Sequence, residues 1–242
     1  LADDLRGNHF QTAAALQLLG TAANEEGSSR ANHVQVLGMN NDFWKLAHRN
    51  PNLLFAEDKI ALNESLATQL NVKVGETILL RVPKPSLLSR DAPISPQQDS
   101  STAFRLTVAA ILSDAELGNF SLRASQIPPN NAFVSLKFLQ EKLGLNDKAN
   151  LVLATTNTAV SLDELQESLR EKFQLADAEL ELRRVTNQNL LELRSDRVFL
   201  DPPIVRAALE AAPDARLIST YFMNELRVGE LITPYSMVTA AG

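Results

Sequence analysis

Apolar and polar side chains alternate with a period of two in several stretches of the chain, a pattern typical of β-strands. Residues 10–23, rich in Ala, Leu and Thr, and residues 34–37 are predicted to be two strands joined by a turn at 24–27. Residues 42–47, which contain the single tryptophan, Trp44, are predicted to form a short helix that ends near Pro51. The chain is therefore expected to open with a strand pair followed by a helical segment.

The middle of the chain is predicted to be mostly sheet. Asn63 is suited to cap a short helix, and residues 76–82 alternate as a half-buried strand does. Two further strands are predicted over 104–112 and 132–134. Residues 83–101 carry four prolines among Ser, Gln and Asp, so they cannot bury enough apolar surface to offset the entropy of ordering. We predict a mobile surface loop there.

Helices and strands follow one another irregularly in the last part of the chain. The predicted elements are a helix from Ser135 to Gly144, a strand over 151–154, a helix from Ser161, strands over 179–183 and 191–193, a helix from Asp201 to Pro213, and a hairpin of 216–226 and 231–238 around Gly229. The helix from Ser161 has a capping box with Glu164, and its buried stripe is predicted to be Leu162, Leu165, Leu169 and Phe173. This irregular mixture favours an α+β fold over a doubly wound parallel sheet.

Composition and charge exclude several classes of function. The chain has 242 residues, of which 45% are hydrophobic, enough for one large domain or two subdomains. A net charge of -6 without clustered Lys and Arg argues against nucleic acid as a partner. There is no cysteine, which excludes disulfides, thiolate nucleophiles and Cys-based metal sites, and is consistent with an extracytoplasmic setting.

Motifs that would indicate catalysis or a cofactor are missing from the sequence. The three histidines, His9, His33 and His48, lack metal-ligand spacing, and we interpret each as a surface or turn residue. No glycine-rich phosphate loop and no nucleophile elbow occurs. We therefore predict no enzyme activity, no catalytic, metal or cofactor-binding residue, and no cofactor.

Other polar residues have both a functional and a structural interpretation. The adjacent or alternating carboxylates are Asp3-Asp4, Glu25-Glu26 and Glu179-Glu181, and we expect them to be solvated rather than to form an acid–base pair. Ser195-Asp196-Arg197 has no histidine near it in sequence, although folding could still supply one.

The aromatic residues raise the same two alternatives. Phe43 and Trp44 could form a stacking platform for a ligand, but an aromatic pair on a short helix is more typical of a core. Tyr221 and Tyr235 could fix strand ends through hydrogen bonds of their phenols without contacting a ligand.

Several short strings, taken in order, resemble the extracytoplasmic domain of FtsX/MacB-type ABC-transporter permeases. They are His33 to Met39 leading into Asp42-Phe43-Trp44, Ala61 to Ala67, Val72 to Leu80, Ala132 to Leu136 with Leu139-Gln140, Leu193 to Leu200, Tyr221 to Asn224, and Pro234 to Ser236. The most specific part is the helix, small turn, glycine and strand that run through Asn63 and Gly75. The strings span most of the chain in the right order.

The resemblance implies a bilobed domain. A discontinuous, porter-like α/β lobe would consist of 1–57 and 151–242, and a mostly-β lobe over 58–150 would be inserted into it, with 83–101 as its mobile loop. The start at Leu1 and the uncapped end at Gly242 favour a segment of a longer protein whose membrane helices lie outside it. The parent could continue with more extracytoplasmic sequence.

The function that the resemblance implies is mechanical. Cytoplasmic ATPase subunits would move the helices of this permease and of a second permease subunit, and the domain would transmit that motion to a substrate or partner protein. It would lie on the periplasmic or extracellular side of the cell membrane, attached only through helices outside this sequence. The alternative is a secreted or periplasmic ligand-binding module or hydrolase with a cleft between the lobes.

Overall fold

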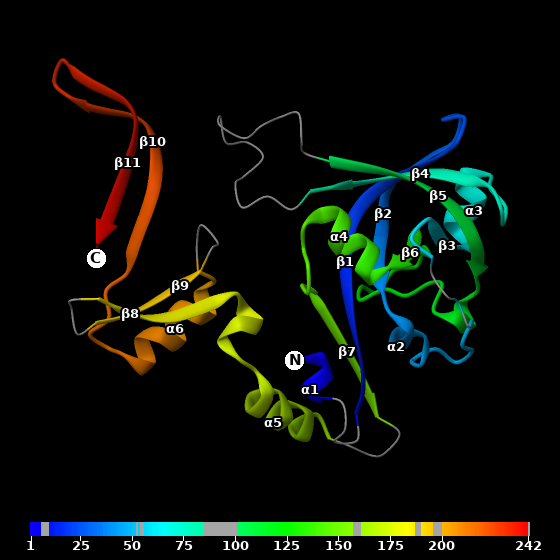
Figure 1. Cartoon of the computed structure of the whole chain (residues 1–242), viewed down its shortest axis with the longest axis horizontal. Helices are drawn as coiled ribbons and strands as arrows, with labels where there is room; N and C mark the ends of the chain where they lie inside the picture. The colour runs from blue at the N-terminus through cyan, green and yellow to red at the C-terminus, as the bar shows by residue number, and fades with distance from the viewer. Residues whose placement is uncertain are drawn as a thin grey trace. The chain divides into compact units, whose positions relative to one another are not determined.

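The structure, a computed structural model, describes residues 1–5, 10–51, 53, 56–84, 101–156, 161–186, 190–195 and 200–241 (Figure 1). Described residues up to Phe173 form one compact unit, and those from Gln174 onward form a second. Both units contain helices and strands, and the fold is α+β as predicted. Within the described residues, no helix is both long enough and apolar enough to cross a membrane.

The first unit contains a seven-stranded mixed sheet and short helices. Its strands are β1 (Phe10–Asn24), β2 (Arg30–Met39), β3 (Lys59–Asn63), β4 (Thr77–Pro83), β5 (Ser101–Leu112), β6 (Asn131–Ser135) and β7 (Leu151–Thr156). Its helices are α1 (Ala2–Leu5), α2 (Asn41–Trp44), α3 (Glu64–Leu70), the 3-10 turn η2 (Asp114–Glu116), α4 (Leu136–Leu143) and α5 (Leu162–Lys172). Each of the strands and helices predicted for this part of the chain is present.

The long strand β1 closes this sheet into a ring. Its residues 10–15 pair with β7, residues 15–23 with β2, and residues 21–24 with β4, while β6, β3 and β5 complete the circuit. A bulge allows β1 to pass from one neighbour to the other: the pairs Gly20–Val34 and Ala22–Ala31 leave Asn32 and His33 opposite Thr21. Side chains inside such a ring are removed from water without an exposed sheet edge.

Two apolar clusters fill the first unit. The larger joins the sheet to α3 and α4 through Leu66, Leu70 and Leu139, and the smaller places Phe43 and Trp44 against Phe133. The Phe43 and Trp44 rings meet edge to face with centroids 5.1 Å apart, and both side chains are buried. The interpretation of this pair as core is confirmed.

The second unit is built from short, local pairings. It contains η3 (Leu175–Ala178), the hairpin β8 (Leu180–Val185) with β9 (Leu190–Ser195), α6 (Pro202–Ala211), and the hairpin β10 (Ile218–Val228) with β11 (Leu231–Ala241). The predicted hairpin around Gly229 is confirmed, and so is the helix that starts after Asp201. None of the described residues of this unit is fully buried.

Some sequence-based expectations differ from the structure. The 1–57 segment shares one sheet with the strands of 58–150, because β1 pairs with β4 and β2 with β6. Of the segments expected in one discontinuous lobe, the described residues of 1–57 and of 151–173 lie in the first unit, and those from 174 onward lie in the second. Most of the loop predicted to be mobile, residues 85–100, lies outside the described residues.

The predicted buried stripe of α5 is wrong. Leu162 and Phe173 are exposed, and Leu165 and Leu169 are only half-buried. The Ser161 hydroxyl does accept a hydrogen bond from the Glu164 amide, as the predicted cap requires. An amphipathic pattern reports that a helix has an apolar face, but it does not supply a neighbour to cover that face.

Candidate interaction surface

The β10–β11 hairpin presents an unusual surface. Its strands pair in one constant register from Ile218–Ala241 to Val228–Leu231, and the chain reverses at Gly229, which adopts a φ of 59°. Because alternate residues of a strand point to opposite sides, this register divides the side chains into two faces.

One side, which we call the apolar face, consists of Ile218, Thr220, Phe222, Asn224, Leu226, Val228, Leu231, Thr233, Met237, Thr239 and Ala241. All of these residues are exposed. On the opposite face Ser219, Met223, Ser236 and Val238 are half-buried. The apolar face is therefore the open side of the hairpin.

Within the paired strands, charge is confined to the opposite face. Glu225 and Arg227 lie there, and the Arg227 Nε donates to the Glu225 Oε1 at 3.0 Å. On the apolar face, the Oγ1 atoms of Thr220 and Thr239 are hydrogen-bonded to each other at 3.0 Å across the strands. One of the two threonine hydroxyls therefore donates to the other within the hairpin.

The apolar side chains of this face are strongly exposed. Val228 and Leu231 are each 77% exposed, Met237 74%, Ile218 69% and Leu226 40%. A two-stranded hairpin alone is marginally stable in water, and an apolar surface of this kind typically marks an interaction site. The arrangement is suited to binding a protein surface rather than to chemistry.

The β8–β9 hairpin differs in this respect. Its exposed strands are linked by ion pairs of Arg183 with Glu192 and of Arg194 with Glu181, the latter at 2.7 Å. Glu179, predicted on the strand, instead precedes it with a φ of 57°. These charges make β8–β9 a solvated hairpin, although Leu182 and Leu191 are also exposed.

Two buried polar groups in the first unit hold loops rather than form a reactive site. The Asn63 Oδ1 accepts from the amides of Leu66 and Asn131, each at 3.1 Å, and its Nδ2 donates to the Pro129 carbonyl at 2.7 Å and to Asn119 Oδ1 at 3.1 Å. This one side chain thus caps α3 and fixes the segment that leads into β6.

Glu116 is the second of these two buried polar groups; Thr12 and Asn131 are also buried. The Ser113 amide donates to its Oε2 at 3.0 Å, and the Arg49 guanidinium donates to its Oε1 at 2.7 Å. These hydrogen bonds, that of the Ser113 amide foremost, lower the pKa of the Glu116 carboxyl. The ion pair closes a loop and leaves the carboxylate acceptor-only.

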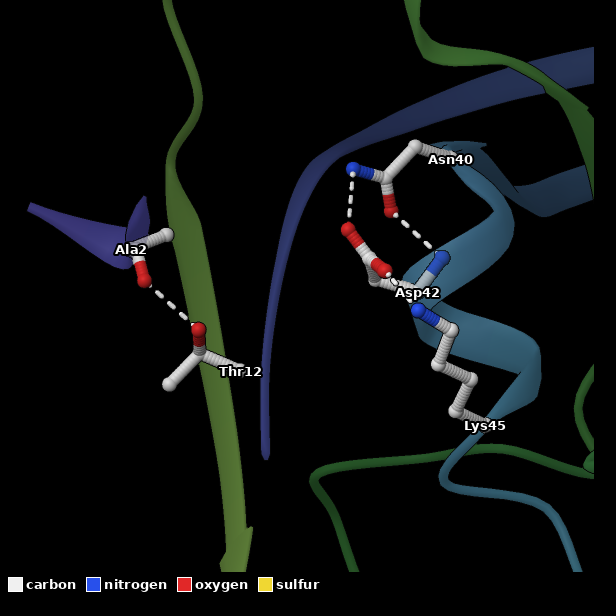
Figure 2. Close-up of polar contacts among 5 residues, drawn as sticks. All are labelled: Ala2, Thr12, Asn40, Asp42 and Lys45. Carbon is white, nitrogen blue, oxygen red and sulfur yellow. Dashed lines mark hydrogen bonds and ion pairs between the residues drawn. The ribbon is translucent and has the colours of Figure 1, made fainter. Parts of the chain in front are cut away.

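Polar contacts near the start of the chain are also local (Figure 2). The Asn40 side chain accepts from the Asp42 amide at 3.1 Å and so caps α2, while Lys45 Nζ lies 2.7 Å from Asp42 Oδ1. The Thr12 hydroxyl donates to the Ala2 carbonyl at 2.6 Å and ties α1 to β1. Each contact stabilises a helix end.

The residues considered for chemistry do not come together in the described structure. His33 and His48 are exposed, and no group of three metal-ligating side chains occurs among the described residues. Asp3, Asp4, Glu25, Glu26 and Glu181 are exposed. Tyr221 is exposed on β10; His9, Asp196, Arg197 and the side chain of Tyr235 lie outside the described set.

A shallow hollow of about 400 Å³ lies over the β1 bulge. It is lined by Leu19, Gly20, Thr21, Asn32, His33, Arg81, Pro83 and Ser101. Its lining is mainly apolar. His33, at a φ of 56°, takes part because the bulge turns its backbone outward.

Sequence reasoning found the hairpin but missed the apolar face. The available signal was the placement of Glu225 and Arg227 at odd positions of β10, with Phe222, Leu226 and Val228 at even positions. Reading it required the register, because only pairing shows which residues of β11 share each side.

No protein-family model matches the sequence, and no curated protein matches it. Among solved structures, the chain is similar to the periplasmic region of MacB from Actinobacillus actinomycetemcomitans. The two share 11% sequence identity over 86% of this chain and 80% of that chain, with a TM-score of 0.47.

Proposed function

We propose that this chain is a non-catalytic, extracytoplasmic domain of an FtsX/MacB-type ABC-transporter permease that transmits ATP-driven motion to a partner or substrate. The observation that carries the proposal is the apolar face of β10–β11, an uncharged binding surface on an exposed hairpin. A domain that works by contact needs such a surface.

The local structure of the strings that resemble this family supports the proposal. Residues 61–80 form the end of β3, helix α3, a turn through Gly75 at a φ of 94°, and β4, in the order that the family unit has. The strings at 221–224 and 234–236 pair within one hairpin, Met223 opposite Ser236. The hairpin that displays the apolar face is thus made from two of the strings.

The closed ring suits a mechanical role. Its strands are hydrogen-bonded to neighbours around the circuit, and its core is continuous with α3 and α4. Such a packed core moves as a rigid body rather than deforming gradually. A displacement applied to this unit by membrane helices of the parent protein would therefore move the unit as one body.

Two experiments test this proposal. The parent reading frame should contain an apolar stretch of about 20 residues before this segment and about three after its extracytoplasmic region. The isolated chain should neither bind nor hydrolyse ATP, since its sequence has no Walker motif. A signal peptide without further apolar stretches, or ATP binding at micromolar affinity, would contradict the proposal and favour a secreted binding protein or hydrolase.

A further inference from the structure

We propose that the apolar face of β10–β11 pairs with the same face of a second copy of this chain, giving a two-fold dimer. The inference concerns what covers the hairpin. It rests on the same face as the proposed function and names a second copy of the chain as what contacts that face, whereas the parent reading frame tests the proposed function separately. The inference rests on the chemistry, area and symmetry of this face.

The apolar face is compatible with itself. Its described side chains are apolar or uncharged, and Glu225 and Arg227 point to the other side of the hairpin. Two copies placed face to face would therefore bring no like charges together and bury no ion without a partner. A charged partner would find no complementary group here.

The area is sufficient for a specific dimer. The exposed parts of Ile218, Leu226, Val228, Leu231 and Met237, at roughly 180 Å² for a fully exposed side chain, amount to roughly 600 Å² per copy. Complete burial of these residues in two copies would amount to at most roughly 1,200 Å², the lower end of the range for stable interfaces. The neighbouring threonines would add to this.

Symmetry provides what the single hairpin lacks. Two antiparallel hairpins that stack about a two-fold axis form a four-stranded sandwich, with sheets about 10 Å apart and side chains interleaved. Each hairpin then gains the core that a lone pair of strands does not have.

Sedimentation velocity of the 242-residue chain tests the proposal. We expect a concentration-dependent dimer that 0.5 M salt leaves intact or strengthens, because each copy carries a net charge of -6 and the interface carries none. The double variant Val228→Asp/Leu231→Asp should weaken the dimer about a hundredfold, since it places carboxylates in the apolar contact. Ile232→Asp, on the opposite face of the same strand, should leave association unchanged.

Cross-linking provides a readout that does not depend on these variants. The chain has no cysteine, so Met237→Cys introduces the only thiol and should form a covalent dimer with a short bismaleimide, whereas Ile232→Cys should not. A chain that stays monomeric up to about 100 µM, or one in which Ile232→Asp disrupts association as strongly as the double variant, overturns the proposal. A monomer with a protected apolar face would mean that the same chain covers it.

Discussion

Replacing Asn63 by alanine should lower the free energy of unfolding of the first unit by more than the loss of a single hydrogen bond would. Asn63 is fully buried and makes four hydrogen bonds, two through each end of its amide. Loss of the helix cap costs about 1 kcal/mol. The buried Asn131 amide, left without an acceptor, adds about 1–3 kcal/mol, and the Pro129 carbonyl also loses its donor. We expect a total of about 3 kcal/mol.

Urea unfolding followed by the fluorescence of Trp44 measures this loss directly. Trp44 is the only tryptophan and is buried in the first unit, so its signal reports that unit and not the hairpins of the second. Asn40→Ala is the matched control, because Asn40 also caps a helix but is exposed, and it should cost about 0.5–1 kcal/mol. An Asn63→Ala loss no larger than that of Asn40→Ala would refute the reasoning.

Two further changes test the same unit. Gly118→Ala should lower the free energy of unfolding in urea by about 2–3 kcal/mol, because the added Cβ would lie 2.4 Å from the Leu112 carbonyl oxygen. Gly144→Ala has open space around its Cβ and should cost only about 1 kcal/mol, because Gly144 has a φ of 68°. Equal losses for the two variants would contradict this. Glu116→Gln should lower the unfolding free energy by about 1–2 kcal/mol at neutral pH and leave it nearly unchanged at pH 2. The sign follows from the lowered pKa of Glu116. Its hydrogen bond from Ser113 stabilises the folded protein at pH values above the ordinary pKa of 4.5, and this stabilisation is lost as the pH falls through the pKa of the folded state. A variant as sensitive to acid as the native chain would show that the carboxylate contributes nothing.

The local elements could be predicted from the sequence because each has its own signal. Asn63 and Ser135 cap α3 and α4 as their positions indicated, and Gly144 ends α4 in the left-handed conformation. The strands could be predicted from the alternation of apolar and polar residues, since the two faces of a strand differ in burial. Each of these signals involves only a few neighbouring residues, so it can be recognised in the sequence without knowledge of the fold.

The closure of the sheet and its division into units could not be predicted in this way. Residues 10–24 read as one strand, but nothing in their pattern says that they pair with three partners in turn. Gly20 is where a side chain would lie 2.7 Å from the Arg81 carbonyl oxygen, a constraint that exists only once β4 is in place. The predicted lobe boundary at residue 57 consequently fell within one sheet.

The candidate interaction surface could also be predicted only in part from the sequence. Alternation predicted the hairpin, and the sequence without catalytic motifs favoured a non-catalytic role. The apolar face emerged only when the pairing of Val228 with Leu231 and of Phe222 with Met237 placed β11 residues on the same side as those of β10. The register between two strands depends on contacts between residues on different strands, and the pattern of one strand alone does not specify it.

The central claim, that this domain lies outside the cytoplasmic membrane, is tested most directly by thiol labelling in intact cells. Glu26→Cys places a single exposed thiol in the β1–β2 turn of a cysteine-free domain, in a parent protein cleared of any other cysteine, and Val36→Cys, fully buried, serves as its control. We predict that a membrane-impermeant maleimide labels Glu26→Cys while the cytoplasmic membrane is intact, and labels Val36→Cys only after denaturation. Labelling of Glu26→Cys only after that membrane is broken would contradict the account.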